Sequence, residues 1–493
     1  MEDRSGETGY ERLGAPKLSL IDVVAQSVGF MGPVFSAAFL IPLIVGANPS
    51  AKGAGIAAPL SVVLAAIGVF ALGWIVAQYA KKIHAAGALY DYVSNGLGQN
   101  VGAASGWLYY GGTLILTTGL GVLIGGYVHD TLLPTLGVDG GILPIWLWNV
   151  VWAAALFLVL YLGVQISTRV QLTLALVSVA VVLLFVLKVI IDVGGDNDLA
   201  VVLKPGSSPD GWSGILFGVL YGVLIFVGFE SAANLAEETT EPKRQIPRAV
   251  LGAVVTVSIF YLIVSYAYMA GFGFDLGNVF AAADAPLFAL GSPESAGGFG
   301  SDLISKVLVI VVLLDILAVG VGAAVASTRG VFAMARDRRL PAPLASVSGH
   351  GTPLGAIVLL MAIQAVMISA TELWESLFAL PDTPHYFAVF AWAATFGGFA
   401  LLVVYLLMSL GALRGLADHP NKSGLYVAVL LGVAITVAGI YGSFYKVTSP
   451  FLLAPWFALL WFVLGLVIMF VVKGRTPASQ TLADLRSDRE VYP

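Results

Sequence analysis

The sequence lacks cysteine and carries little charge. With no cysteine among 493 residues, a disulfide framework and a cysteine-ligated metal or redox centre are excluded. The five histidines stand singly, without the HExxH spacing of a zinc enzyme, so we predict no metal and no other cofactor. A net charge of −5 argues against nucleic acid as a partner. Only 11% of the residues are charged, whereas a soluble domain needs about 25% to cover its surface.

Hydrophobic residues make up 58% of the chain, so a lipid bilayer must cover what the few charges cannot. We therefore predict an all-α integral membrane protein. Residues 1–19 are polar and lack the short apolar core and cleavage site of a signal peptide. We expect them to form a cytosolic tail before the first membrane span.

A helix needs about 20 apolar residues to cross a hydrocarbon core of about 30 Å. Twelve apolar runs meet this length, which predicts 12 transmembrane helices. The runs are 21–47, 55–79, 101–128, 143–163, 169–193, 212–237, 248–272, 302–328, 353–379, 386–412, 424–443 and 452–472.

Lysine and arginine predict the orientation. If the N-terminus is inside the cell, the cytosolic segments hold 19 of the 24 basic residues. Cytosolic loops of membrane proteins carry such an excess. We expect a multi-pass protein of the cell membrane with both termini in the cytosol.

One stretch between the second and third spans does not cross the membrane. Leu89, Tyr92, Val93 and Leu97 recur there at helical spacing. This pattern predicts a short helix along the inner membrane interface. A structured loop without a helix is the alternative.

Two spans contain helix-breaking residues near their middle. Span 1 holds Gly29, Gly32 and Pro33 close together, and span 6 holds Gly228 beside Glu230. A proline inside a helix removes one hydrogen bond and clashes with the preceding turn. Broken helices at corresponding positions of two halves indicate an inverted-repeat transporter. The free amides and carbonyls at such breaks suit a small zwitterion, although packing glycines and a proline kink would give the same pattern.

Three stretches resemble the amino acid–polyamine–organocation (APC) permeases. GFESAANLAEETTEPKRQIPRAV, residues 228–250, is similar to the family's end of helix 6 and the basic loop after it. AGALYDYVSNGLGQNVGAASGWLYY, residues 86–110, resembles the stretch around its inner helix and helix 3. ASTRGVFAMARDRRLPA, residues 326–342, resembles its end of helix 8.

The resemblance implies the leucine-transporter fold, a 5+5 inverted repeat with broken helices 1 and 6. The expected parts are a tail at 1–19, a first repeat at 20–193, a second repeat at 212–412, two added helices at 424–472 and a cytosolic tail at 473–493.

The resemblance also implies a small-molecule substrate, usually an amino acid and less often a polyamine or related amine. Its carboxylate would meet backbone amides between Gly29 and Gly32, and its amine would meet carbonyls of both breaks. Phe229 would close over it. The expected substrate-binding residues are Gln26, Ser27, Gly29, Phe30, Met31, Gly32, Phe226, Val227, Gly228 and Phe229.

Two positions depart from the family pattern. Helix 1 reads VGFMGPVF where many relatives have a G-x-G run, which leaves the amide donors open. Some proton-coupled relatives carry a lysine in helix 5 at the position of Ser178. A lysine amine therefore cannot carry the proton here.

The candidates for proton coupling or gating are Glu230, Asp315 and Ser178. Glu230 and Asp315 are carboxylates inside the spans, where a charge is costly and usually functional. Glu230 has a structural alternative, bonding the unwound backbone of its own helix. Asp315 has another, snorkelling outward or pairing with Lys188. Sodium coupling is disfavoured because residues 318–324, in the middle of helix 8, contain no hydroxyl.

Charged residues at the inner end suggest a gate of ion pairs. Glu237 and Glu238 provide the carboxylates, and ordinary solvated termini are the alternative. The candidate cations are Lys243, Arg244, Arg248 and Arg336.

The sequence thus predicts a secondary active transporter that moves amino acids or related amines, with proton symport favoured and ion-independent exchange as the alternative. A channel or a membrane enzyme is a further alternative. The sequence has no filter loop, which a channel would need, and no clustered His, Asp or Ser, which an enzyme would need. We predict no enzyme activity. The substrate's side chain and the oligomeric state stay open.

Overall fold

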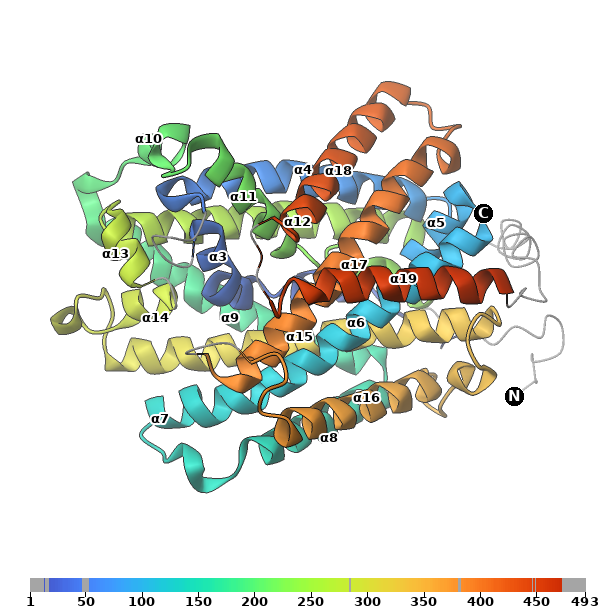
Figure 1. Ribbon diagram of the computed structural model, residues 1–493, viewed down its shortest axis with the longest axis horizontal. Helices are drawn as coiled ribbons and strands as arrows, with labels where there is room; N and C mark the ends of the chain where they lie inside the picture. Colours follow the sequence, from blue (N-terminus) through green and yellow to red (C-terminus); the bar gives the residue numbers. More distant parts are fainter. Residues whose placement is uncertain are drawn as a thin grey trace.

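Helices form almost the whole structure, which is a computed structural model (Figure 1). It describes residues 13, 17–46, 53–282, 285–379, 383–445, 447 and 449–471. Most of the predicted N-terminal tail and all of the C-terminal tail lie outside these residues.

Eleven helical segments within the described ranges are long and apolar enough to cross a membrane. The helices in these segments are α1 (Leu20–Met31) continued by α2 (Pro33–Phe35), the π-helical turn η1 (Ser36–Leu40) and α3 (Ile41–Val45), then α4 (Ala58–Ala80), α6 (Gln99–Tyr127), α8 (Ile145–Leu162), α9 (Val164–Val193), α12 (Pro242–Gly271), α15 (Asp302–Arg336), α16 (Leu354–Leu373), α17 (His385–Gly415), α18 (Lys422–Gly442) and α19 (Leu453–Val471).

The predicted count of twelve is not confirmed, and the difference lies in span 6. Its apolar helix α11 (Gly211–Leu224) is too short to cross alone, because the helix stops at Leu224 inside the apolar run. The chain continues from Ser231 to Glu238 as the 3-10 helix η7. Together, α11 and η7 occupy the range predicted for span 6.

The third span lies at the centre of the bundle. Of its apolar window, 89% is buried, against 22% for α8 and 28% for α19. Helix α6 packs against α17, α15, α19 and α8, and α17 crosses the bundle obliquely (Figure 1). Helix α1 packs on α9, α12 and α15, which places its break inside protein.

The predicted short helix after span 2 is present as α5 (Leu89–Leu97). Leu89, Tyr92 and Val93 are buried, and α5 packs on α6 and α17. Its apolar face therefore covers protein rather than lipid. Helix α5 lies at one end of the bundle, opposite the short connecting helices α7 (Leu133–Thr135), α10 (Leu199–Val202) and α13 (Leu276–Ala281) (Figure 1).

Candidate functional site

The break in helix 1 occurs at Gly32 and Pro33. Gly32 has a left-handed backbone, with φ of 56°, and its amide still donates to the carbonyl of Val28 at 3.2 Å. From Pro33 the helix starts again and continues to Val45. Because proline has no N–H, the first amides of this second half belong to Val34 and Phe35. The first amide donors of the second half thus lie just beyond the Gly29–Gly32 range expected from the sequence.

The break in helix 6 depends on Gly228. After α11 ends, residues 225–230 form turns, and Gly228 has φ of 106°. A Cβ at this position would lie 2.6 Å from Cγ of Phe30 in helix 1. Glycine is therefore needed both for the backbone conformation and for the close approach of the two breaks.

Side chains of α1 and η7 join the two breaks. Ser27 Oγ donates to the Phe229 carbonyl at 2.7 Å, and Ser231 Oγ donates to the Gln26 carbonyl at 3.1 Å. Gln26 Nε2 donates to the Gly322 carbonyl of α15 at 2.9 Å. Several residues expected to bind substrate thus already have partners within the protein, although a carbonyl can accept a second hydrogen bond.

A tyrosine and a serine donate hydrogen bonds to other carbonyls at the breaks. Tyr261 of α12 donates to the carbonyl of Ile225, directly after α11, at 2.6 Å. Ser36 Oγ donates to the carbonyl of Met31, the last residue of α1, at 3.1 Å. Backbone groups freed at membrane depth need such internal partners.

Glu230 is fully buried at the start of η7. Tyr109 of α6 donates to its Oε1 at 2.8 Å, and Tyr405 of α17 donates to its Oε2 at 2.7 Å. The ring of Phe229 lies 5.4 Å from that of Tyr405. Glu230 therefore fastens the helix 6 break to two core helices, which supports the structural alternative for this residue.

Asp315 is fully buried and holds the helix 1 break. Its Oδ2 accepts a hydrogen bond from the Phe35 amide at 2.7 Å. Its Oδ1 has no hydrogen-bond partner within the described part of the chain. Lys188 instead bonds Asp192 and the Phe299 carbonyl, so the suggested pairing with Lys188 is wrong and Asp315 does not snorkel.

Ser178 connects two helices and cannot carry a proton near neutral pH. Its hydroxyl donates to the carbonyls of Leu174 and Val311, both at 2.8 Å. The second bond ties α9 to α15. Among the described residues, no group of three or more His, Cys, Asp or Glu side chains could hold a metal ion.

Two ion pairs lie at the end of η7, and we call them the inner pairs. Arg329 Nε lies 2.6 Å from Glu238 Oε2, and both side chains are at least 96% buried. Arg336 donates to both oxygens of Glu237, at 2.8 and 2.6 Å. Glu237 and Arg336 were both among the residues expected at the gate, although no pairing was predicted. Arg329 was not among them, although it precedes Arg336 by two helical turns on the same face of α15.

The other cations proposed for the gate are exposed. Lys243, Arg244 and Arg248 all face solvent, and Arg244 lies 3.7 Å from the exposed Glu241. This part of the gate prediction is wrong, because these residues start α12 rather than line η7. Asp337 lies next to the inner pairs, and Tyr90 donates to its Oδ2 at 3.0 Å. Burial raises the pKa of Asp337, and Arg336 partly opposes that shift.

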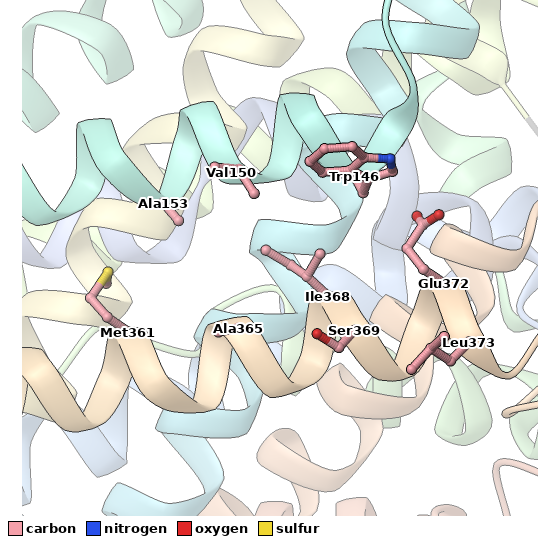
Figure 2. A pocket seen from close by; sticks show the side chains of 9 residues that line it. All are labelled: Trp146, Val150, Ala153, Met361, Ala365, Ile368, Ser369, Glu372 and Leu373. Carbon is pink, nitrogen blue, oxygen red and sulfur yellow. The ribbon is translucent and has the colours of Figure 1, made fainter.

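A groove of about 600 Å³ between α8 and α16 lies apart from both breaks (Figure 2). Trp146, Val150 and Ile368 line it, and Glu372 lies toward one end. Trp146 and Val150 are 43% and 44% exposed. The groove is therefore on the outer, lipid-facing side of two peripheral helices and is not part of the candidate site.

Comparisons with known proteins agree on one family and one fold. The family model described as amino acid permease matches residues 28–416. The branched-chain amino acid permease BcaP of Lactococcus lactis subsp. cremoris is 23% identical, covering 93% of this chain and 94% of that protein. The lysine-specific permease LysP of Escherichia coli is 23% identical, covering 85% and 87%.

Solved structures show the same fold at low identity. MhsT in complex with L-phenylalanine superposes with a TM-score of 0.54 at 13% identity, covering 90% of this chain and 100% of that one. The Eremococcus coleocola manganese transporter gives 0.54 at 14% identity, covering 93% and 97%. Both are leucine-transporter-type folds, which confirms the predicted fold class.

The contact at Gly228 predicts a stability defect. Gly228→Ala should lower the apparent melting temperature in detergent, because strained backbone costs about 1–3 kcal/mol and the Cβ meets Phe30. Gly252→Ala is the matched control, since a Cβ there meets nothing within 4 Å. Equal melting temperatures for the two variants would contradict the packing described.

The inner pairs predict that breaking a buried ion pair lowers the stability of the protein more than breaking an exposed one. Glu238→Gln or Arg329→Gln alone should destabilise by about 3–5 kcal/mol, because each leaves a buried charge without its partner. The double variant should recover part of this loss. The exposed pair Glu241→Gln and Arg244→Gln should change stability by about 0–1 kcal/mol. Unfolding of all variants in one detergent, read by tryptophan fluorescence, tests this; equal effects at both pairs would refute it.

Proposed function

The chain belongs to the amino acid permease family, and from this premise we propose that it carries its substrate together with protons. As a member of this family, the protein is a secondary transporter of amino acids and not an enzyme. It is a multi-pass membrane protein. We further propose that it works in the cell membrane by alternating access, with both termini in the cytosol, as the distribution of Lys and Arg indicates.

We place the substrate where the two breaks meet. Gly228 lies against Phe30, and Ser27 bonds Phe229, so the residues expected from both helices come together. The amides of Val34 and Phe35 open the second half of helix 1, where the positive end of the helix dipole favours a carboxylate. The carbonyls that end the first half-helices suit an ammonium group.

Relatives differ in the substrates that their names state. They include permeases for branched-chain amino acids, for lysine and for gamma-aminobutyric acid. These compounds share an amine and a carboxylate and little else. We therefore assign the two groups and leave the side chain unassigned.

The proposal of proton coupling rests on a difference in hydrogen bonding between two buried carboxylates, Glu230 and Asp315. Both oxygens of Glu230 accept tyrosine hydrogen bonds, so protonating it would break one of them. Asp315 keeps one oxygen without a partner, and a proton can bind there without loss of a hydrogen bond. We assign the proton to Asp315 and a structural role to Glu230. Helix α15 offers little to sodium, because residues 318–324 in its middle contain no hydroxyl and Ser327 and Thr328 lie nearer its end.

We expect an inward proton gradient to stimulate uptake of an amino acid. The test is a panel of labelled amino acids and amines added to liposomes that contain the protein, with and without the gradient. Uptake that requires preloaded amino acid and ignores the gradient would instead establish exchange and refute proton coupling.

The two carboxylates should differ in the same assay. Asp315→Asn should abolish the stimulation by the gradient, because an amide cannot carry the proton. Glu230→Gln should retain it, with lower stability where the hydrogen bonds of the two tyrosines weaken. Loss of stimulation in Glu230→Gln alone, with Asp315→Asn unaffected, would reverse the assignment.

A further inference from the structure

The chain's own carboxylate occupies the place proposed for the substrate's carboxylate. Asp315 comes from α15, 280 residues after Phe35, and its Oδ2 is 2.7 Å from the Phe35 nitrogen. The neighbouring amide of Val34 also interacts with this carboxylate. These amides open the helix that continues to Val45, and they are the donors that a bound carboxylate would need.

Helix α15 packs closely against the break in helix 1. A Cβ added at Gly32 would lie 2.1 Å from Cγ2 of Val319 and 3.4 Å from Oδ2 of Asp315. Val319 and Asp315 are one helical turn apart on α15, so together they cover the break from one side. A second carboxylate cannot reach the Phe35 amide while Asp315 occupies it.

Backbone, rather than a side chain of the described residues, donates to Asp315. Its Oδ1 has no partner in the described residues, although the side chain is fully buried. Tyr261, the titratable neighbour on α12, uses its hydroxyl proton for the Ile225 carbonyl. Lys188 of α9 is bonded to Asp192 and the Phe299 carbonyl. Backbone amides are therefore the donors that hold Asp315, and another carboxylate can replace it on equal chemical terms.

We propose that Asp315 is a resident substitute for the substrate carboxylate, and that a substrate binds by displacing it from the Phe35 amide. This inference rests on the proposed substrate position, where an amino acid meets the start of the second half of helix 1. It makes Asp315 a specificity-determining residue. An amine that carries a carboxylate displaces Asp315 and frees α15 from helix 1, whereas an amine without one leaves that contact in place.

Equilibrium binding in detergent, without any gradient, tests the proposal. The twenty amino acids are screened, and the tightest binder is compared with the amine obtained by removing its carboxylate. Asp315→Ala should lower the Kd of the amino acid about tenfold, because a hydrogen bond to a charged group no longer has to be exchanged. The Kd of the amine should stay the same within about twofold.

Two further variants keep the test decisive. Asp315→Asn preserves the shape of the side chain and accepts the Phe35 hydrogen bond as a neutral group, so it should give an intermediate Kd. Asp302→Ala removes an exposed aspartate from the start of the same helix and should change neither Kd.

The outcomes separate this inference from the proposed function. Tighter amino acid binding in Asp315→Ala, with no gradient-driven uptake in liposomes, would support the displacement of Asp315 by the substrate and refute proton coupling. Weaker binding of both compounds would make Asp315 a counter-ion for the amine and overturn the inference. Unchanged binding, an equal gain for amine and amino acid, or no binding of any amino acid to any variant would overturn it as well.

Discussion

The structure depends on one constraint: two helices stop inside the membrane, where each free N–H or C=O needs a partner within the protein. Every element near the breaks contributes to meeting it. Ser36 and Tyr261 donate to carbonyls that end the first half-helices, Ser27 and Ser231 connect the two breaks, and Asp315 accepts from the restarted helix. Because these partners come from α1, η1, η7, α12 and α15, the breaks join helices that lie far apart in the sequence. A continuous pair of helices would need none of them.

The same constraint gives the two buried carboxylates different roles. Glu230 has both oxygens bonded by tyrosine hydroxyls from α6 and α17, the two helices at the centre of the bundle. Such a group stabilises the turn that precedes it. Asp315 satisfies an amide of helix 1 but keeps an oxygen without a partner. A group that is needed by the backbone yet incompletely bonded itself can exchange its partner, and a transporter needs that property at the site that must hold and release a substrate.

Sequence reasoning located the breaks because their cause is local. Proline lacks an N–H, and Gly228 sits beside a charge in an apolar run, so both signals lie within a few residues. It also included Glu237 and Arg336 among the gate candidates, since the residues lie within motifs that the family resemblance covers, but it did not pair them. It missed the contacts between Asp315 and Phe35 and between Arg329 and Glu238, which join residues 280 and 91 positions apart. Both contacts depend on the axial position and the rotation of α15 relative to helix 1 and η7. Hydropathy carries no information on that relative placement. The count of twelve spans is not confirmed because it treated 212–237 as one crossing helix, whereas α11 stops at Leu224, at the predicted break.

The 3-10 helix η7 links the proposed substrate site to the inner pairs. At its start, Ser231 bonds the Gln26 carbonyl and Glu230 precedes it; at its end, Glu237 and Glu238 bind Arg336 and Arg329 of α15. Asp315 lies on that same helix, nearer to the break in helix 1. Both ends of η7 are therefore attached, directly or through helix 1, to α15. Both inner pairs are formed, and the side chains of Arg329 and Glu238 are nearly inaccessible. Release of Asp315 from Phe35 would remove one attachment of α15 to helix 1 and leave the inner pairs to hold it. Moving α15 away from η7 then requires separating the buried charges of the inner pairs, which is favourable only if water reaches them in the same movement.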